Sequence, residues 1–574
     1  MENTKNHQKT QNDQNSQPKL RIIPLGGQEE VGRNMTIFEY GGDILILDMG
    51  LQFPEENMHG IDYIIPNISC LRGKEKNIKA VIFSHGHLDH IGAAPILLEK
   101  LGYPPIIGRD LTLALIKNRM EDFKPESSKL LKTINIKSFQ DKFQFGKFEV
   151  EFFPVEHSLI DAVGAIIKSP QGTVIHPGDW TMDYDAPYDQ AINYNQLAKL
   201  PKPTILMLES LAATNYEQPV SEKTMHENLE KLVREAPGRI LIGTFSSQLK
   251  RIKHLVEYSH KIGKKIALDG YSLKNTIEIA KELGYVKFPN HAVIPIKSVS
   301  DYPDNKIVII CTGAQGEGKG VLSRIVNDNH KYIRLKKSDT VVFSSSVVPG
   351  NERTIQALKD SLYRKSDNVI HSDIMDVHVS GHCTAEDIKE MLRQVKPSFY
   401  LPVYANHYFL KEAEKIAVSI GFPKQNIFIL DNGSIIEFSG EKGRILKKKV
   451  DTSYVFVDGL GVGDIGHVVI RDRQMMAEDG MFTIFVIIDS KTSKIMAEPI
   501  LISRGFIYMK GSPELIKETK EKVKEIVDKR ISKQNTASTT DWSYLRDYIR
   551  DDIGQFLYNK TERRPLVLPV ILEI

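Results

Sequence analysis

The stretch KAVIFSHGHLDH, residues 79–90, decides the fold of this chain. Its apolar run Ala80 to Phe83 predicts a buried strand. Four potential metal ligands follow the strand at once: His85, His87, Asp89 and His90. Imidazole and carboxylate ligands together suit zinc or manganese, and the mixture favours a pair of ions over one. A solvated polar turn would explain a lone His-x-His, but this longer motif directly after a strand indicates a metal site.

The bulk composition is that of an ordinary soluble globular protein, and a length of 574 residues predicts several domains. The 76 basic and 73 acidic residues leave a net charge of +3, so any nucleic-acid surface must be a local patch. Three cysteines without a CxxC pair argue against a disulfide framework and fit the reducing cytoplasm. Residues 1–18 predict a disordered polar tail, and no apolar run reaches the length of a membrane helix.

Two patterns of strands divide the chain into an interrupted domain and a further unit. From Leu20, short apolar strands alternate with Gly-rich turns, and five of them end near a reactive side chain: Asp48, His85, His157, Asp179 and Glu209. In layered α/β folds such strand ends converge on one edge, where loops build the site. From about Thr214, strands alternate with helices, which is typical of a parallel sheet in a separate domain. The first pattern resumes near His378.

Residues 450–574 indicate a unit of mixed type. Its expected strands are 466–472, 481–489, 494–503 and the apolar end of the chain, 565–574. An amphipathic helix opens at Ser512 and Pro513, a second begins near Trp542, and a polar linker (533–540) joins the two. No chemistry is evident in this unit, so core packing and oligomerisation are its expected roles.

With these motifs, the chain resembles the metallo-β-lactamase superfamily, in its nucleic-acid-processing β-CASP branch, and within that branch the bacterial ribonuclease J family. The resemblance runs from about residue 20 to the end. The segments that carry it are GGQEEVGRN at 26–34, SHGHLDHIG at 84–92, HSLIDAVG at 157–164, GDW at 178–180, TGAQGE at 312–317, SSSVVPGNE at 344–352, HVSGH at 378–382, VIRDRQMMAEDG at 469–480 and SRGFIYM at 503–509.

The resemblance implies an α/β fold class: a metallo-β-lactamase αββα sandwich interrupted by a β-CASP α/β domain, plus a C-terminal α+β domain. The expected limits are 1–18 for the tail, 19–212 and 376–445 for the two parts of the sandwich, 213–375 for the β-CASP domain and 446–574 for the C-terminal domain.

The resemblance also implies the metal ligands and the catalytic residues. One divalent ion would bind His85, His87 and His157, a second would bind Asp89 and His90, and Asp179 would bridge both. Zinc is expected, with manganese or magnesium as alternatives. The implied catalytic residues are Asp89, Glu209 and His382, the last of which could contact a phosphate or protonate the leaving oxygen. The alternative for Glu209 and His382 is a purely structural hydrogen-bonded pair.

Gly-rich and Ser-rich loops supply the expected phosphate ligands. Residues 313–319 satisfy G-x-x-x-x-G-K, but Gly320 replaces the Ser or Thr of a P-loop, which argues against nucleotide binding. Backbone amides in such a loop still form an anion cradle, suited to RNA phosphates. The expected substrate- and phosphate-binding residues are Ser272, Gly313, Gln315, Gly316, Ser344, Ser345, Ser346, Asn351, His378, Ser380, Gly381 and His382.

The chain departs from the family pattern at three positions, one of which is Glu209, where Asp is commoner and the charge is the same. Tyr404 stands where the family has its last histidine ligand, and a phenol with a pKa near 10 is a poor ligand. Three outcomes are open: a weakened second metal site, which we favour, ligation by His407 instead, or a site with one tight ion. The family's Gly-Arg-Ser loop reads Gly270-Tyr271-Ser272, which loses an arginine whose fork would match a phosphate.

The function expected from the resemblance is cytoplasmic hydrolysis of RNA in rRNA processing and mRNA decay. The activity would be a 5′→3′ exonuclease on single-stranded RNA with a 5′ monophosphate, with some endonuclease activity. A homodimer or homotetramer would assemble through the C-terminal domain. The alternative is a weakly active or inactive RNA-binding paralogue that partners an active ribonuclease, and Tyr404 motivates it. A small-molecule hydrolase would have no use for the inserted domain.

Overall fold

The computed structural model describes residues 17–182, 192–217, 220–316, 320–348, 350–490, 492, 494–531 and 542–574. Almost all of the expected tail and the whole linker 533–540 therefore lie outside the described residues. The chain forms two units, one with Met1–Phe53 and Ile64–Val455 and the other with Pro54–Tyr63 and Phe456–Ile574. No helix within the described ranges combines the length and the hydrophobicity that crossing a membrane requires.

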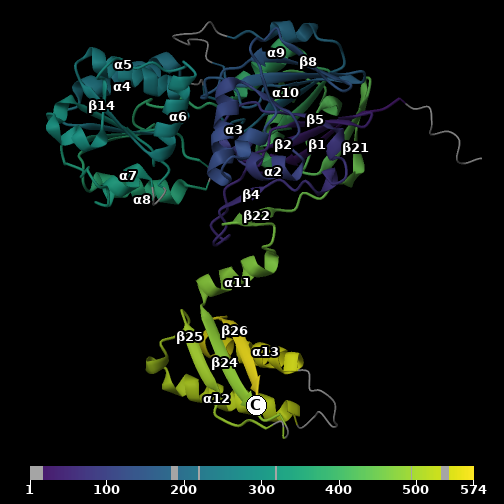
Figure 1. Ribbon diagram of the computed structural model, residues 1–574, viewed down its shortest axis with the longest axis vertical. Helices are drawn as coiled ribbons and strands as arrows, with labels where there is room; N and C mark the ends of the chain where they lie inside the picture. The colour runs from purple at the N-terminus through teal and green to yellow at the C-terminus, as the bar shows by residue number, and fades with distance from the viewer. Residues whose placement is uncertain are drawn as a thin grey trace, which may run out of the picture. The chain divides into compact units, whose positions relative to one another are not determined.

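Two facing β-sheets form the part of the first unit that carries the metal motif (Figure 1). The first sheet has the order β21 (Lys442–Lys449), β20 (Ser434–Ser439), β1 (Leu20–Gly26), β2 (Met35–Tyr40), β3 (Asp43–Leu47), β5 (Ile78–Ile82), β6 (Ile106–Gly108), β7 (Thr133–Asn135). The second has the order β19 (Phe399–Val403), β12 (Thr204–Glu209), β11 (Gly172–His176), β10 (Val163–Ser169), β9 (Phe148–Pro154), β8 (Lys142–Phe145). Apolar side chains of both sheets, such as Phe38 and Val150, meet in one buried core and hold the layers together.

Helices flank the two sheets. On the first sheet, α1 (Leu88–Ile91) and α2 (Ala94–Lys100) follow β5, and α3 (Asp110–Phe123) contacts β6 and β7. On the second, α9 (Ala385–Val395) and α10 (His407–Ser419) bury Met391 and Ile416 against strand residues such as Leu206. The result is the αββα sandwich that the family resemblance implied.

The chain between β12 and α9 forms an inserted α/β domain. Its sheet is parallel, in the order β15 (Val293–Ile294), β14 (Lys265–Asp269), β16 (Ile307–Cys311), β13 (Ile240–Thr244), β17 (Thr340–Ser344), β18 (Asn368–Ile370). One face is covered by α4 (Glu222–Glu235), α5 (Leu249–Lys261) and α6 (Tyr271–Glu282), and the other by α7 (Val321–Val326) and α8 (Glu352–Tyr363) (Figure 1). The alternation of strands and helices expected after Thr214 is therefore present.

A pair of stacked histidines on α4 and α5 leads us to expect that the stability of the inserted domain depends on pH. The rings of His226 and His254 lie 3.9 Å apart. Burial, with His254 and Arg251 nearby, lowers the pKa of His226 from 6.5 to about 3. Below about pH 6.5 the unfolded chain therefore binds a proton that the folded chain does not. The free energy of unfolding contributed by this group is full above that pH and falls by about 1.4 kcal/mol per pH unit below it.

We expect acidification from pH 7 to pH 5 to lower the melting temperature of the wild type more than that of His226→Phe, which keeps a stacked ring. Circular dichroism melts at a series of pH values check this. Identical pH slopes for the two proteins would show that His226 is not the titrating group.

The second unit packs two helices on a small sheet. The sheet has the order β25 (Ile500–Arg504), β24 (Met481–Ile488), β26 (Leu566–Glu573), and α12 (Pro513–Ile531) and α13 (Trp542–Thr561) share its core. Both helices and the last strand were predicted. The remaining described strands are β4 (Tyr63–Ile65), β22 (Val455–Asp458) and β23 (Gly461–Val462).

Two predictions for the second unit were wrong. Residues 466–472 are not a strand, because they begin the helix α11 (His467–Glu478), in which Val468 and Val469 are exposed. Their β-branched side chains suggested a strand, but the following Gln-Met-Met-Ala-Glu favours a helix and prevails. The strand expected from 494 begins only at Ile500, directly after Pro499, which has no backbone N–H to donate to a sheet.

Candidate metal centre

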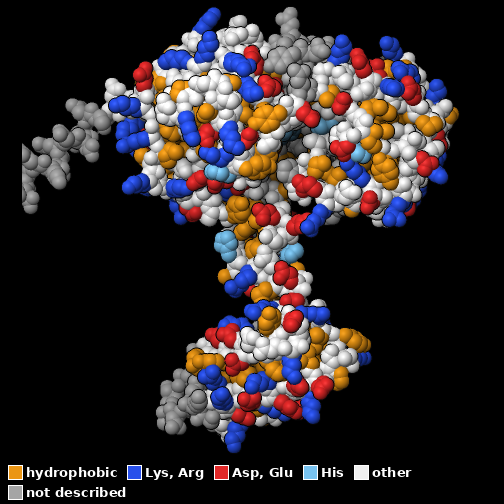
Figure 2. All heavy atoms as spheres, turned by 180° about the vertical axis from the view of Figure 1, so that it is seen from behind, with side chains coloured by type: hydrophobic (Ala, Val, Ile, Leu, Met, Phe, Trp, Pro, Cys, Tyr) orange, Lys and Arg blue, Asp and Glu red, His pale blue; other side chains and the backbone are white. Residues whose placement is uncertain are grey.

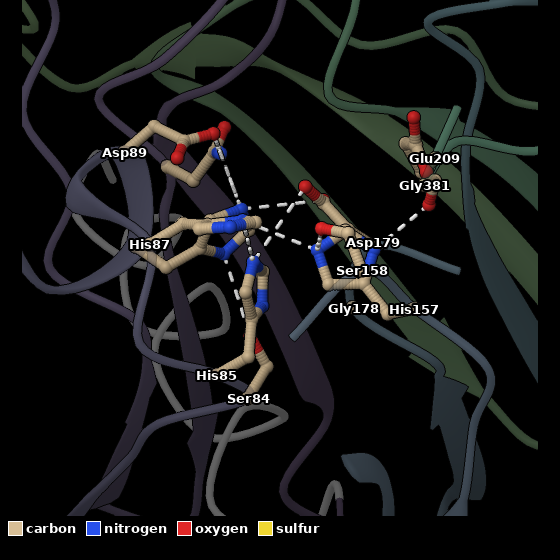
Figure 3. Close-up of polar contacts among 12 residues, drawn as sticks. Ser84, His85, His87, Asp89, His157, Ser158, Gly178, Asp179, Glu209 and Gly381 are labelled. Atoms are coloured by element: carbon tan, nitrogen blue, oxygen red, sulfur yellow. Dashed lines mark hydrogen bonds and ion pairs between the residues drawn. The ribbon is translucent and has the colours of Figure 1, made fainter. Parts of the chain in front are cut away.

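The turn after β5 presents the metal motif at the edge of the sandwich. The carboxylate of Asp48, at the end of the neighbouring strand β3, accepts hydrogen bonds of 2.9 Å from both the backbone N and the Oγ of Ser84. Helix α1 then begins at Leu88, directly after His87. This anchored turn between a buried strand and a helix directs the motif's side chains into one small volume (Figure 3).

Three imidazole nitrogens meet in that volume. The Nδ1 of His87 lies 3.0 Å from the Nε2 of His85 and 3.1 Å from the Nε2 of His157. Burial lowers the pKa of all three, that of His157 to about 3, so the rings are neutral, which is the form that binds metals. Nitrogen atoms this close around one volume suit a shared divalent cation with ligand distances of about 2 Å.

A second cluster lies beside the first. The Nε2 of His90 is 3.3 Å from the Oδ2 of Asp89 and 3.2 Å from the Oδ1 of Asp179. The other oxygen of Asp179 lies 3.7 Å from the Nε2 of His85, so this carboxylate faces both clusters (Figure 3). Burial alone would lower the pKa of His90, but the carboxylates of Asp179, Asp89 and Asp48 raise it well above its usual value. The cluster therefore favours positive charge, as a cation site must.

Polar neighbours orient the ligands of both clusters. The Nδ1 of His90 lies 2.8 Å from Asp48, and Asn34 Nδ2 lies 3.1 Å from the Nε2 of His90 and 3.3 Å from Asp89. The Nδ1 of His157 donates to the carbonyl oxygen of Gly381 at 2.8 Å, which leaves the Nε2 lone pair for the cluster. A side chain at position 381 would crowd the His157 ring, since a Cβ there would lie 3.0 Å from it. Sequence reasoning missed Asn34 and these orienting contacts.

Glu209 and His382 form an ion pair next to Asp179, on the side of the Oδ2 atom that also faces His85. The Nδ1 of His382 lies 2.6 Å from Glu209 and 3.8 Å from Asp179. Burial alone would lower the pKa of His382, but Glu209 raises it to about 9, so the ring is protonated near neutral pH. The backbone N of Trp180 donates to the other Glu209 oxygen. The structure thus brings together all six expected metal ligands and this expected catalytic pair.

Tyr404 is buried beside the second cluster. Its ring centre lies 5.5 Å from that of His90 and 5.0 Å from that of His176. Burial and the nearby carboxylates raise the pKa of the phenol well above its usual value, so it stays protonated and is a poor ligand. The half-exposed His407 belongs to a different group, with its Nδ1 3.1 Å from Glu29, so the structure does not support it as a replacement.

Some of the expected phosphate ligands already use their side chains in hydrogen bonds within the protein. The Gln315 side chain donates to the Ser346 carbonyl and accepts from the Val348 N, and the Ser344 Oγ donates to the Val377 carbonyl, so these side chains shape loops. Ser345 is buried beside them, and Asn351 contacts Gln315.

Most of the other expected phosphate ligands are at least partly accessible. Ser272, Ser346 and Ser380 are exposed, whereas His378, Gly381 and His382 are half-buried on the segment before α9. Gly313 and Gly316 take positive φ angles of 97° and 77° in their loop. Their contacts with phosphate stay predictions.

Comparison with known proteins gives a family for this arrangement. The chain matches the metallo-β-lactamase superfamily over residues 30–190, the ribonuclease J β-CASP domain over 237–362 and the ribonuclease J C-terminal domain over 468–574. Ribonuclease J2 of Bacillus subtilis strain 168 is 34% identical to it over 97% of this chain and 99% of its own length. The chain belongs to the ribonuclease J family.

Other ribonuclease J proteins are similarly close. Ribonuclease J 1 of Streptococcus pyogenes serotype M3 is 35% identical over 96% of this chain and 97% of its own, and Ribonuclease J 2 of Staphylococcus aureus strain MRSA252 is 32% identical over 97% and 98%. A crystal structure of a protein of unknown function from Enterococcus faecalis V583 has a TM-score of 0.53 and 16% identity, over 73% of this chain and 100% of that chain, which shows likeness of fold alone. The predicted fold class is thus confirmed, and it implies binding of divalent metal.

Because Tyr404 is a poor ligand, we expect the two metal sites of this ribonuclease J family member to differ in affinity. We expect the wild type to hold one ion tightly and the second, at Asp89, His90 and Asp179, more weakly. Tyr404→His should tighten the second ion by about 10- to 100-fold, by adding an imidazole ligand. Tyr404→Phe is the matched control and should bind like the wild type. Metal titration with elemental analysis measures this, and full double occupancy of the wild type and Tyr404→His alike would contradict it.

Proposed function

We propose that this chain is a metal-dependent ribonuclease that hydrolyses RNA phosphodiester bonds with two divalent ions. Zinc is the proposed metal, and manganese and magnesium are the alternatives. The observation that carries the proposal is the double cluster in which Asp179 faces both groups of ligands. The name of the curated relatives, ribonuclease J, supports RNA as the substrate. The proposed ligands are His85, His87 and His157 for one ion, Asp89 and His90 for the other, and Asp179 for both.

The side chains around the clusters fit the needs of such a reaction. When bound, the two cations supply an ionised water near neutral pH and positive charge beside the phosphate. Asp48 and Gly381 orient the rings of His90 and His157, which would hold the ions. His382, kept protonated by Glu209, would donate a proton to the leaving oxygen.

Single-stranded RNA with a 5′ monophosphate is the proposed substrate, degraded 5′→3′ with some endonuclease activity, in cytoplasmic RNA processing and decay. The Gly-rich loop at Gly313 and Gly316 and the serines after β17 offer anion-binding groups in the inserted domain. Figure 2 shows a hollow in the first unit where pale-blue histidine side chains are visible. Basic and acidic side chains are interspersed over the face seen there, so RNA recognition would rely on local groups.

Three RNA substrates test the proposal. With manganese, the purified chain should degrade 5′-monophosphorylated RNA to mononucleotides from the 5′ end, and 5′-triphosphorylated RNA at least about tenfold more slowly. It should cut circular RNA slowly, by endonuclease activity alone. RNA binding without hydrolysis would instead support the inactive partner subunit that Tyr404 motivates. Degradation from the 3′ end would contradict the proposed direction.

We propose assembly into a homodimer or homotetramer through the second unit. Strand pairing places Phe485, Ile500 and Val570 side by side on the sheet face opposite the core, next to Leu568 and Leu572. Ile500, Leu568 and Leu572 are 54%, 39% and 45% exposed, which makes this face an apolar surface suited to a second copy. Light scattering of the wild type and of Ile500→Lys tests the oligomeric state; a monomeric wild type would contradict the proposal.

A further inference from the structure

Arg251, on α5 of the inserted domain, is a buried cation that no mechanism above uses. Only 1% of its surface is exposed. Its Nη1 donates to the Ser344 carbonyl at 3.0 Å and to the Nδ1 of His378 at 2.8 Å. Within the described part of the chain, its Nε and Nη2 have no hydrogen-bond partner. Burial lowers the pKa of Arg251 and the Glu222 carboxylate only partly offsets this, so a cation with two unpaired donor atoms is costly to keep at this buried position.

What Arg251 holds is the start of the segment that returns to the sandwich, residues 377–383. A guanidinium can only donate, so the Nδ1 of His378 must accept and its Nε2 carries the proton. The Oγ of Ser344 donates to the Val377 carbonyl at 2.7 Å and also lies 3.1 Å from Arg251 Nη1. The core of the inserted domain therefore fixes the backbone at Val377 and the side chain of His378.

The same segment reaches the metal centre within three residues. The carbonyl of Gly381 accepts from the metal-cluster residue His157, and His382 pairs with Glu209. Each extended residue spans only about 3.4 Å, so a displacement at His378 leaves little slack before it moves Gly381. The Gly381 carbonyl is also what leaves the His157 Nε2 facing the cluster.

We propose that Arg251 is a positioning residue: it holds segment 377–383 so that Gly381 orients His157 and His382 meets Glu209. It thereby couples the inserted domain to the metal centre. The catalytic part of this inference rests on the proposed ribonuclease function, whereas the metal-binding part does not.

The test compares Arg251→Met with Arg239→Met in the full chain. Arg239 is also buried in the inserted domain, but it forms an ion pair with Asp339 at 2.6 Å. It directly precedes β13, whereas Thr244 ends that strand. Cobalt(II), used as the metal probe, reports the ligand geometry by its visible absorption. We expect Arg251→Met to bind cobalt about 10- to 100-fold more weakly with an altered spectrum, and the control to bind like the wild type. Arg251→Lys, which keeps one donor group, should restore part of the affinity.

RNA hydrolysis adds a second readout. Arg251→Met should lower kcat at least about tenfold at saturating metal with little change in KM, because the reacting centre rather than RNA binding is disturbed. If Arg251→Met does not fold, Ser344→Ala removes one bond to Val377 and should weaken cobalt binding a few-fold. A folded Arg251→Met, or failing that Ser344→Ala, with wild-type cobalt affinity and spectrum would overturn the inference. Wild-type protein that binds cobalt but hydrolyses no RNA would refute the proposed function alone.

Discussion

Asp179→Asn is expected to lower RNA hydrolysis by about a thousandfold or more. Its carboxylate faces both ligand clusters, and the amide would remove charge from each. Paired cations contribute several kcal/mol of transition-state stabilisation, and about 4 kcal/mol corresponds to a thousandfold in rate. Single-turnover assays with manganese measure the rate, and elemental analysis should show fewer ions per chain than in the wild type under the same conditions.

The matched control for this prediction is Asp161→Asn. Asp161 is an equally buried aspartate of the same sandwich, but it accepts hydrogen bonds from Thr112 and lies outside both ligand clusters. Its variant should retain activity within about threefold and the metal content of the wild type. An Asp179→Asn protein with two ions and full activity would contradict the proposed bridging role.

Replacing His382 by Gln is expected to lower kcat by about 10²- to 10³-fold while the metal content stays that of the wild type. The loss follows from removing the protonated group that faces the clusters, since general acids contribute 10²–10⁴-fold. An RNA in which sulfur replaces the leaving bridging oxygen separates catalysis from structure. A thiolate leaves without a proton, so the variant should cleave this substrate nearly as fast as the wild type does.

The outcome for His382→Gln also decides between the two interpretations of its pair with Glu209. A purely structural pair predicts a lower melting temperature and equal loss on the oxygen and sulfur substrates. Rescue by sulfur at an unchanged melting temperature would exclude that alternative.

The parts of the site that lie together in the sequence were the ones that could be predicted from residues alone. His85 to His90 follow one strand, so their convergence is a local matter of strand, turn and helix. His157 and Asp179 end other strands; the convergence of strand ends on one edge made them candidates, and the family resemblance assigned them as metal ligands.

Other features depend on tertiary contacts that leave no sequence pattern. The carbonyl of Gly381 and the amide of Asn34 act through position rather than type, so neither could be identified beforehand. The loop contacts of the Gln315 side chain could not be identified beforehand either, and its contact with phosphate stays a prediction. In α11, local β-propensity misled because the two valines are exposed and the helix-favouring residues after them decide the conformation.

The order of strands in the sandwich has a consequence for synthesis on the ribosome. Strand β1 pairs with β20, and β12 pairs with β19, although more than 150 residues separate the members of each pair. All six proposed ligands leave the exit tunnel long before these partners do. A nascent chain should therefore be unable to seal the layers until residue 439 has emerged, so the RNA-cutting centre would stay unfinished while most of its own messenger is read.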